Sequence, residues 1–196
     1  MLTIPNLLTL LRLILVPFFL VASFNHAWTI ALVIFVSAAV TDIFDGMLAR
    51  RLNQRSRLGA LLDPAADKIM MICGYLFYTL EQHLPGIGLP AWLTFTVFIR
   101  DFLILTFAYL LYTRVHVKRF PPSWAGKAST LLQALTLGTT IAVNGFLPQL
   151  TRLAELLFRV ALVVTLYSSF DYLRRGEQLL ENGMAQAQAV GMRAEG

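Results

Sequence analysis

Four aspartates with helical spacing are the residues of this chain best suited to chemistry. They lie in the segment TDIFDGMLARRLNQRSRLGALLDPAAD, residues 41–67, and are Asp42, Asp45, Asp63 and Asp67. The first two are spaced i, i+3 and the last two i, i+4, so in helices each pair shares one face, with Cβ atoms about 5–6 Å apart. Long apolar segments flank both pairs. The pattern therefore predicts two carboxylate pairs near the facing ends of two apolar helices.

Carboxylates gathered in a partly dehydrated site remain ionised together only when cations lie among them; otherwise their pKa values rise. Hard divalent cations prefer oxygen ligands, which indicates Mg²⁺ or Mn²⁺, with Ca²⁺ as an alternative. Four carboxylates suit two metal ions about 4 Å apart, a common arrangement for displacement at phosphorus. We therefore expect a site for two divalent cations that acts on a phosphate ester.

A purely structural role is the alternative for the four acids. The residues between the pairs include four arginines that could form ion pairs with them, Arg50, Arg51, Arg55 and Arg57. Ionisable residues in membrane helices are functional by default, and matched pairs favour the metal site over this alternative. Gly46, Ala49 and Gly59 lie beside the acids. Small side chains there either admit a flat base and its phosphates or allow close helix packing, and both interpretations stay open.

The elements that position the acids are apolar helices. Hydrophobic residues make up 57% of the 196 residues and charged residues 14%, with a mean hydropathy of +0.67. Such a composition indicates an integral membrane protein, because a bilayer span needs about 20 apolar residues. We expect an all-α polytopic protein with six transmembrane helices, at residues 8–24, 27–49, 60–81, 90–113, 125–146 and 150–173.

We expect a short amphipathic segment at the start of the chain and a polar tail at its end. A short amphipathic segment, IPNLLTLLR, precedes the first span and places Asn6, Thr9 and Arg12 on one face. That face is either a polar stripe at the lipid headgroups or a wall of the active site. Residues 1–175 are expected to form one transmembrane domain, and residues 176–196 a flexible polar tail or a loose surface helix. The single cysteine, Cys73, excludes a disulfide within the chain.

The distribution of Lys and Arg predicts the orientation in the membrane. Nine of these residues lie in the loops after the second and fourth spans or at the end of the sixth span, and the alternate loops carry Arg152. Both termini and the acid-rich loop are therefore expected on the cytoplasmic side. Because that loop is short, the second and third spans are expected to be antiparallel neighbours, so that all four acids converge.

The acid-rich segment resembles the signature of the CDP-alcohol phosphotransferase family. Its pattern is Asp42-x2-Asp45-Gly46-x2-Ala49-Arg50-x8-Gly59-x3-Asp63-x3-Asp67, and all eight specified positions of the signature are present. The resemblance extends to about residue 175, because six spans with the motif across the second and third are the family's arrangement. It implies transfer of a substituted phosphate from a CDP-linked donor to an alcohol, with release of CMP.

The resemblance also implies roles for individual residues. The four aspartates would hold two divalent metals, and Asp67 would be the general base for the acceptor hydroxyl. The CDP pocket would be formed by Asp42, Gly46, Ala49, Arg50 and Gly59. It further implies a homodimer, an inner membrane of bacterial type and membrane lipids as partners. A covalent phosphatidyl-enzyme is the rival mechanism, with Ser56 as the nearest hydroxyl, but no histidine lies near it in sequence to activate it.

The acceptor alcohol is less well indicated than the donor. IPNLLTLLR and GKASTLLQ resemble the phosphatidylglycerophosphate synthases of the family, which join CDP-diacylglycerol to glycerol-3-phosphate. NQRSRLGALLDPAADKI and RDFLIL also resemble its cardiolipin synthases, which use phosphatidylglycerol. Glycerol-3-phosphate is the favoured acceptor. The Arg100-Asp101 pair replaces the Arg-Glu more usual in the glycerophosphate enzymes, which keeps phosphatidylglycerol open.

A phosphorylated acceptor needs cations, and Arg100, Lys127 and Arg159 lie in or near the fourth, fifth and sixth spans. Asp101 is expected to point elsewhere on the helix. Arg100 would therefore bind either the substrate phosphate or form a structural ion pair with Asp101 or with Glu155 from another helix. A divalent-metal transporter is the competing class, but it would place its acids near the midplane and in repeats. No nucleic-acid-binding motif is found.

Overall fold

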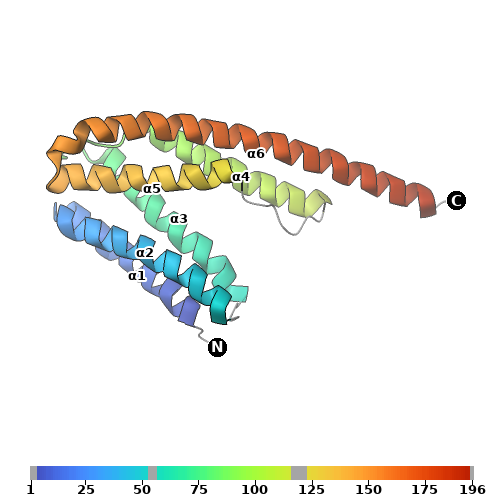
Figure 1. Ribbon diagram of the computed structural model, residues 1–196, viewed down its shortest axis with the longest axis horizontal. Coiled ribbons are helices and arrows are strands. Elements are labelled where there is room, and N and C mark those ends of the chain that lie inside the picture. Colours follow the sequence, from blue (N-terminus) through green and yellow to red (C-terminus); the bar gives the residue numbers. More distant parts are fainter. Residues whose placement is uncertain (1–3, 53–56, 116–122, 195–196) are drawn as a thin grey trace. The chain divides into compact units, whose positions relative to one another are not determined.

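The computed structural model describes residues 4–52, 57–115 and 123–194, with side chains at 10–41, 68–107 and 123–176. These residues form helices and connecting turns without any strand, which confirms the all-α prediction for this part of the chain. Figure 1 shows the elements in chain order. They are α1 (Ile4–Phe24), α2 (Trp28–Leu52), α3 (Arg57–Leu80), α4 (Ala91–Val115), α5 (Trp124–Gly145), the 3₁₀ turn η1 (Pro148–Leu150) and α6 (Thr151–Ala194).

One helical segment of the described chain is long and apolar enough to cross a membrane. It is Pro148–Gly176, 29 residues with a mean hydropathy of 1.6. Shorter apolar stretches occur at Leu10–Phe24, Trp28–Thr41 and Lys68–Leu80. The described helices match the six expected spans in position, but their crossing of a bilayer remains a prediction.

The two ends of the chain differ from the expectation. The amphipathic segment is not separate, because α1 runs without interruption from Ile4 to Phe24. At the other end, α6 extends beyond the expected span of 150–173 and continues to Ala194. Residues 176–194 contain four alanines and three glutamines, which favour helix, and three glycines, which do not, but no proline to end the helix.

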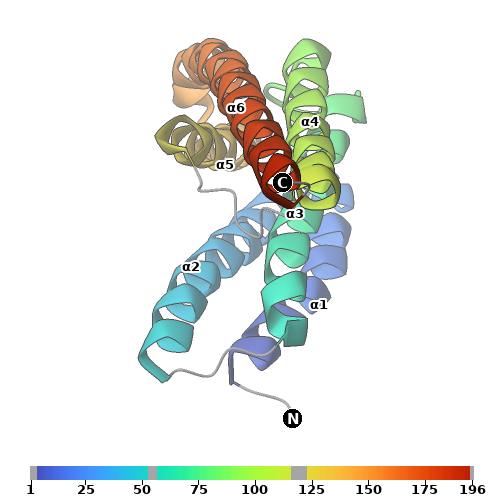
Figure 2. The same cartoon turned by 90° about the vertical axis from the view of Figure 1, so that its right-hand side faces the viewer.

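The chain divides into two compact units, and the first comprises residues 1–90 and 134–157. In it α1 packs beside both α2 and α3 (Figure 2). The ring centroids of Phe19 and Phe35 lie 6.2 Å apart, and Tyr75 and Tyr78 are fully buried. The Tyr78 hydroxyl forms a hydrogen bond of 3.4 Å with the Ser23 hydroxyl. These aromatic contacts hold α1, α2 and α3 together.

The segment that follows α3 forms hydrogen bonds with the side-chain amide of Asn144 on α5. Asn144 Oδ1 accepts a hydrogen bond from the Gly86 amide at 2.9 Å, and Asn144 Nδ2 donates to the Ile87 carbonyl at 2.8 Å. The Leu89 amide donates to the Tyr78 carbonyl at 2.8 Å. The polar backbone of this turn is thereby satisfied, which fixes the place where α3 ends.

A glycine pair in the first unit gives a test of this packing. A Cβ on Gly74 would lie 2.5 Å from Leu137 Cδ2, whereas one on Gly138 would lie 3.5 Å from the Phe35 ring. Leu137 is fully buried, so Gly74→Ala is expected to destabilise the protein by about 1–3 kcal/mol through overpacking. Gly138→Ala is the matched control, expected to be neutral or stabilising by up to about 1 kcal/mol. Thermal unfolding in detergent measures both, and equal melting temperatures would contradict the close α3–α5 contact.

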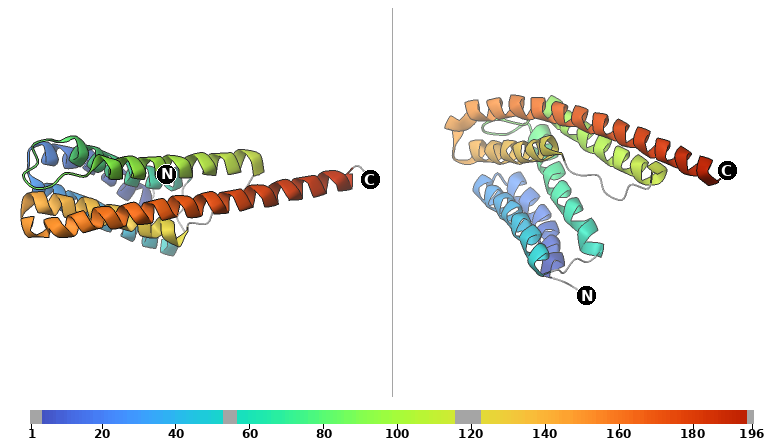
Figure 3. Two further views of the ribbon diagram at one scale, coloured as in Figure 1. Left: turned by 90° about the horizontal axis from the view of Figure 1, so that it is seen from above. Right: turned by 45° about the vertical axis from the view of Figure 1, so that its right-hand side comes forward.

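The second unit comprises residues 91–133 and 158–196. Figure 3 shows α4 and α6 side by side in it, and a Cβ on Gly176 of α6 would meet the Phe107 ring of α4 at 2.7 Å. Between α5 and α6, the Ser129 and Thr165 hydroxyls form a hydrogen bond of 3.0 Å, and Gln133 Nε2 donates to Ser129 Oγ at 3.1 Å. Small and hydroxyl side chains therefore connect the three helices, as is usual between membrane helices.

Candidate active site

The four aspartates lie on two consecutive helices of the first unit. Asp42 and Asp45 belong to the second half of α2, and Asp63 and Asp67 to the first half of α3. Both stretches are helical, so the i, i+3 and i, i+4 spacings do place each pair on one helix face. The C-terminal end of α2, the start of α3 and the start of α1 lie at the same end of this unit (Figures 1 and 2). The carboxylate side chains themselves lie outside the described set.

The donor set at this end of the unit fits hard divalent cations. Its four carboxylates offer only oxygen ligands, which Mg²⁺ and Mn²⁺ accept in preference to softer ligands. The side chains that the structure does describe contain no group of three or more His, Cys, Asp or Glu able to hold a metal. A metal site at the aspartates therefore stays a prediction, which rests on their chemistry and their helical spacing.

Four further expected residues lie on the same two helices. Gly46, Ala49 and Arg50 follow the first aspartate pair on α2, and Gly59 precedes the second pair on α3. Their side-chain environments fall outside the described part of the chain. Their helix positions place them within a few turns of the acids.

Arg12 is a charged residue in the core of the first unit. It lies in the N-terminal half of α1 and is 1% exposed. A buried guanidinium is stable only when anionic or polar groups bind it, and Arg12 does engage in such interactions. Its burial is unlike that of a headgroup-level stripe. At Arg12 the structure therefore disfavours a polar stripe at the lipid headgroups, because the side chain faces the interior of the unit.

Arg100 is buried in the second unit, where it joins three helices. Its Nη1 donates to Asp101 Oδ1 at 2.8 Å, and the two side chains are 6% and 17% exposed. Its Nη2 lies 3.4 Å from the Gly126 carbonyl of α5 and 3.3 Å from Ser168 Oγ of α6. Of the two interpretations of Arg100, the structure shows the ion pair with Asp101. Asp101 was expected to point elsewhere on the helix, but the long guanidinium group reaches its neighbour's carboxylate.

Two further features complete the surroundings of Arg100. Its guanidinium carbon lies 5.9 Å from the centroid of the Tyr172 ring, within the range of a cation–π interaction. Its Nε is buried and has no hydrogen-bond partner in the described chain. The residue is therefore mainly committed to protein contacts, with one donor left for another acceptor.

Lys127 and Arg159 differ from Arg100 in being exposed. The Lys127 ammonium lies 5.2 Å from the centroid of the Trp124 ring. Arg159 lies nine residues before Ser168 on α6, which is about 13 Å along the helix axis. A cavity of about 430 Å³ opens beside Trp124 and is lined on α6 by Tyr167, Asp171 and Arg175. The structure therefore does not gather the three expected acceptor-binding cations around one described cavity.

Several polar partners of Arg100 were missed by reasoning from the sequence. Ser168 and Tyr172 are i, i+4 on α6, on the face that meets α4 and α5. Thr165, one turn earlier, bonds Ser129. The hydroxyl residues at positions 165, 168 and 172, which share one face of the helix, were the available signal, because such residues form hydrogen bonds inside the protein.

Comparison with known proteins assigns the family. The sequence profile of the CDP-alcohol phosphatidyltransferase family matches residues 2–167. The "CDP-diacylglycerol--glycerol-3-phosphate 3-phosphatidyltransferase" of Salmonella typhimurium (strain LT2) is 38% identical over 181 residues, 90% of this chain and 97% of the relative. The protein of the same name from Escherichia coli (strain K12) is 39% identical over 173 residues, 87% of this chain and 92% of the relative.

The matched region contains all eight positions of the acid-rich pattern on α2 and α3. The resemblance inferred from these residues is thus confirmed, and with it the expectation of an enzyme and a transferase. Family and apolar composition together make it a membrane protein. The chain belongs to the CDP-alcohol phosphatidyltransferase family.

Proposed function

We propose that this protein transfers a phosphatidyl group from CDP-diacylglycerol to glycerol-3-phosphate and releases CMP. The observation that carries the proposal is the similarity to enzymes named for this reaction, 38% identity over 97% of the relative's length. The complete aspartate pattern on α2 and α3 supports it, because a relative that had lost the activity would be free to lose these acids.

In the proposed mechanism the four aspartates, Asp42, Asp45, Asp63 and Asp67, would hold two Mg²⁺ or Mn²⁺ ions. When bound, such ions stabilise negative charge on a pyrophosphate and on the leaving nucleotide. Asp67 accepts the proton of the acceptor hydroxyl. The alcohol oxygen then forms a bond to the phosphorus that carries diacylglycerol, the bond from that phosphorus to the CMP oxygen breaks, and CMP leaves with the electron pair.

The substrate pockets are proposed on either side of this reaction. Asp42, Gly46, Ala49, Arg50 and Gly59 would shape the CDP pocket, where small residues allow phosphates and base to approach the backbone. For the acceptor phosphate we propose Arg100, Lys127 and Arg159. The buried Nε of Arg100, which lacks a partner in the described chain, and the exposure of the other two cations support this assignment.

The setting of the reaction is part of the proposal. The protein would cross an inner membrane of bacterial type six times and work as a homodimer, with both termini and the active site on the cytoplasmic side. The helix positions support six spans, and the distribution of Lys and Arg supports the orientation. Residues 1–175 would be the catalytic domain, with the distal part of α6 as a polar extension.

The decisive experiment measures CMP release by the purified protein from CDP-diacylglycerol with Mg²⁺ or Mn²⁺. Glycerol-3-phosphate and phosphatidylglycerol are supplied in parallel. Release with glycerol-3-phosphate and not with phosphatidylglycerol supports the proposal. The reverse result would make the protein a cardiolipin synthase, the second candidate that Arg100-Asp101 keeps open. If neither acceptor gave CMP release and the protein instead carried divalent metal ions across liposome membranes, the protein would be a transporter and not this enzyme.

Removal of divalent metal is expected to abolish turnover. With a chelator such as EDTA in excess, CMP release should fall to background, because four carboxylates without cations repel the pyrophosphate instead of binding it. Re-addition of Mg²⁺ or Mn²⁺ should restore CMP release. Zn²⁺, which prefers nitrogen and sulfur ligands, is added in a parallel sample as the control for the preference of an all-oxygen site. Turnover that persists in the dialysed, chelator-treated protein would rule out the metal assignment.

A further inference from the structure

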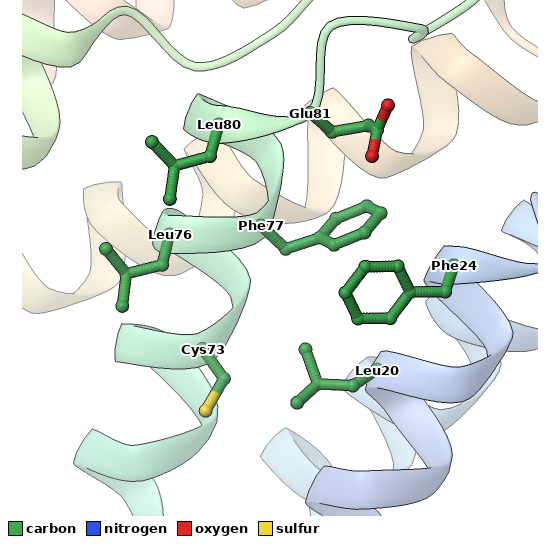
Figure 4. A pocket seen from close by; sticks show the side chains of 7 residues that line it. All are labelled: Leu20, Phe24, Cys73, Leu76, Phe77, Leu80 and Glu81. Atoms are coloured by element: carbon green, nitrogen blue, oxygen red, sulfur yellow. The ribbon is translucent and has the colours of Figure 1, made fainter.

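An apolar groove lies between α1 and α3, at the end of α3 that is remote from the aspartates. Figure 4 shows its lining from both helices. Its volume is about 330 Å³, and it is lined by Leu20, Phe24, Cys73, Leu76, Phe77, Leu80 and Glu81. Leu80 lies 13 residues after Asp67 on α3, which is about 20 Å along the helix axis. The groove is therefore separate from the proposed metal site.

The walls of the groove are held in place by contacts of the first unit. The rings of Phe24 and Phe77 meet edge to face with centroids 4.8 Å apart, and Phe77 packs on Tyr78 in the same way at 5.0 Å. Hydrogen bonds at Asn144 and from the Leu89 amide to Tyr78 fix the segment beyond α3. Phe24 and Leu80, by contrast, are 63% and 70% exposed. The groove is thus rigid at its base and open along its outer side.

A single carboxylate stands at the end of this groove. Glu81 follows the last residue of α3, and Figure 4 shows its side chain extending over the Phe24 and Phe77 rings. Its Oε1 accepts a hydrogen bond from the His83 amide at 3.0 Å and lies 3.3 Å from His83 Nδ1. The described chain gives Oε2 no hydrogen bond. The backbone hydrogen bond from His83 lowers the pKa of Glu81, so the group is anionic at neutral pH.

The nearest Lys or Arg residues on α1 and α3 are Arg12 and Lys68, and each lies 12 residues before the end of its helix, about 18 Å along the axis. The sequence contains no lysine or arginine in residues 13–49, 69–99 or 128–151. His26 and His83 are the neighbouring titratable groups, and both are exposed. An ionised carboxylate beside the exposed Phe24 ring attracts an ammonium group, by charge, by hydrogen bonding and by cation–π interaction. The same carboxylate repels an anionic headgroup.

We propose that this groove binds a phospholipid whose headgroup carries a primary amine, with one acyl chain between α1 and α3 and the ammonium at Glu81. The apolar lining fits an acyl chain, and Glu81 lies where the apolar helix ends, at the level expected of a headgroup. Of the membrane lipids, an amine-headed one complements both parts of the site. Such a lipid would be a structural ligand and not the substrate, since its headgroup lies far from the acids.

Native mass spectrometry of the purified full-length protein tests the proposal. The protein is titrated in detergent with phosphatidylethanolamine and with phosphatidylglycerol that have identical acyl chains. The wild type should retain one phosphatidylethanolamine about tenfold more tightly, the effect of one charge-assisted hydrogen bond of about 1.4 kcal/mol. Glu81→Gln should remove this preference. Glu155→Gln, a change of an exposed acid on α6, is the matched control and should keep it.

The single cysteine supplies a second, independent measurement. Cys73 lines the groove, and the chain has no other thiol. In nanodiscs, alkylation of Cys73 by a maleimide should be several times slower with phosphatidylethanolamine present than with phosphatidylglycerol alone, and Glu81→Gln should abolish the difference. Equal retention of both lipids by the wild type would overturn the proposal. A preference that survives Glu81→Gln in both measurements would overturn it as well. CMP release is recorded in parallel, so that failure of the lipid site is distinguished from failure of the proposed enzyme.

Discussion

Asp63→Asn and Asp67→Asn are each expected to lower CMP release by about 10²–10⁴-fold, because the change removes a metal-binding charge and, at position 67, the proposed base. The amide has the size and shape of the carboxylate, so the helix should be unaffected. The measurement is the rate of CMP release at saturating CDP-diacylglycerol and glycerol-3-phosphate. Full activity in either variant would contradict the two-metal assignment.

Stability separates a catalytic role of these acids from a structural one. Asp63 and Asp67 share one face of α3, so without metal they repel each other. Removing one charge should leave the unfolding temperature of the metal-free protein unchanged or raise it. If the acids were instead partners of nearby arginines, the same change would lower it. Glu155→Gln, an exposed acid on α6, should alter neither activity nor stability.

The positions of the helices could be predicted from the sequence because hydropathy and turn residues mark them. The expected span at residues 125–146 corresponds to α5, Trp124–Gly145, and the span at 90–113 to α4, Ala91–Val115. Proline and glycine in the segment 81–90 mark the turn between α3 and α4. The end of α6 was not predictable in this way, because hydropathy reports where a span leaves the apolar region and not where a helix stops.

The sequence predicts the arrangement of the aspartates better than the surroundings of Arg100. The aspartates are read from their spacing, because helical periodicity fixes which face they share. The surroundings of Arg100 depend on Ser168, 68 residues away, and on the rotamer of its own neighbour Asp101. Neither can be derived from local periodicity. The same holds for the groove beside Glu81, which exists only because α1 and α3 pack together.

Arg100 combines two roles that a pair of variants can separate. Arg100→Gln removes the cation that joins α4, α5 and α6, and breaking such a buried pair is expected to cost about 3–5 kcal/mol of folding free energy. Asp101→Asn removes the same ion pair from the other side and keeps the guanidinium. Both variants should therefore unfold at lower temperature in detergent than the wild type.

Of the two variants, only Arg100→Gln should change the KM for the acceptor. If Arg100 binds the phosphate of glycerol-3-phosphate, Arg100→Gln should raise the KM for that substrate about tenfold or more, the effect of one charge-assisted hydrogen bond. Asp101→Asn should leave that KM close to the wild-type value, because the cation is still present. Arg100→Lys keeps a charge and serves where the glutamine variant does not fold. An equal change of KM in the arginine and aspartate variants would instead assign Arg100 to the packing of α4 against α5 and α6, and acceptor recognition would then rest on Lys127 and Arg159.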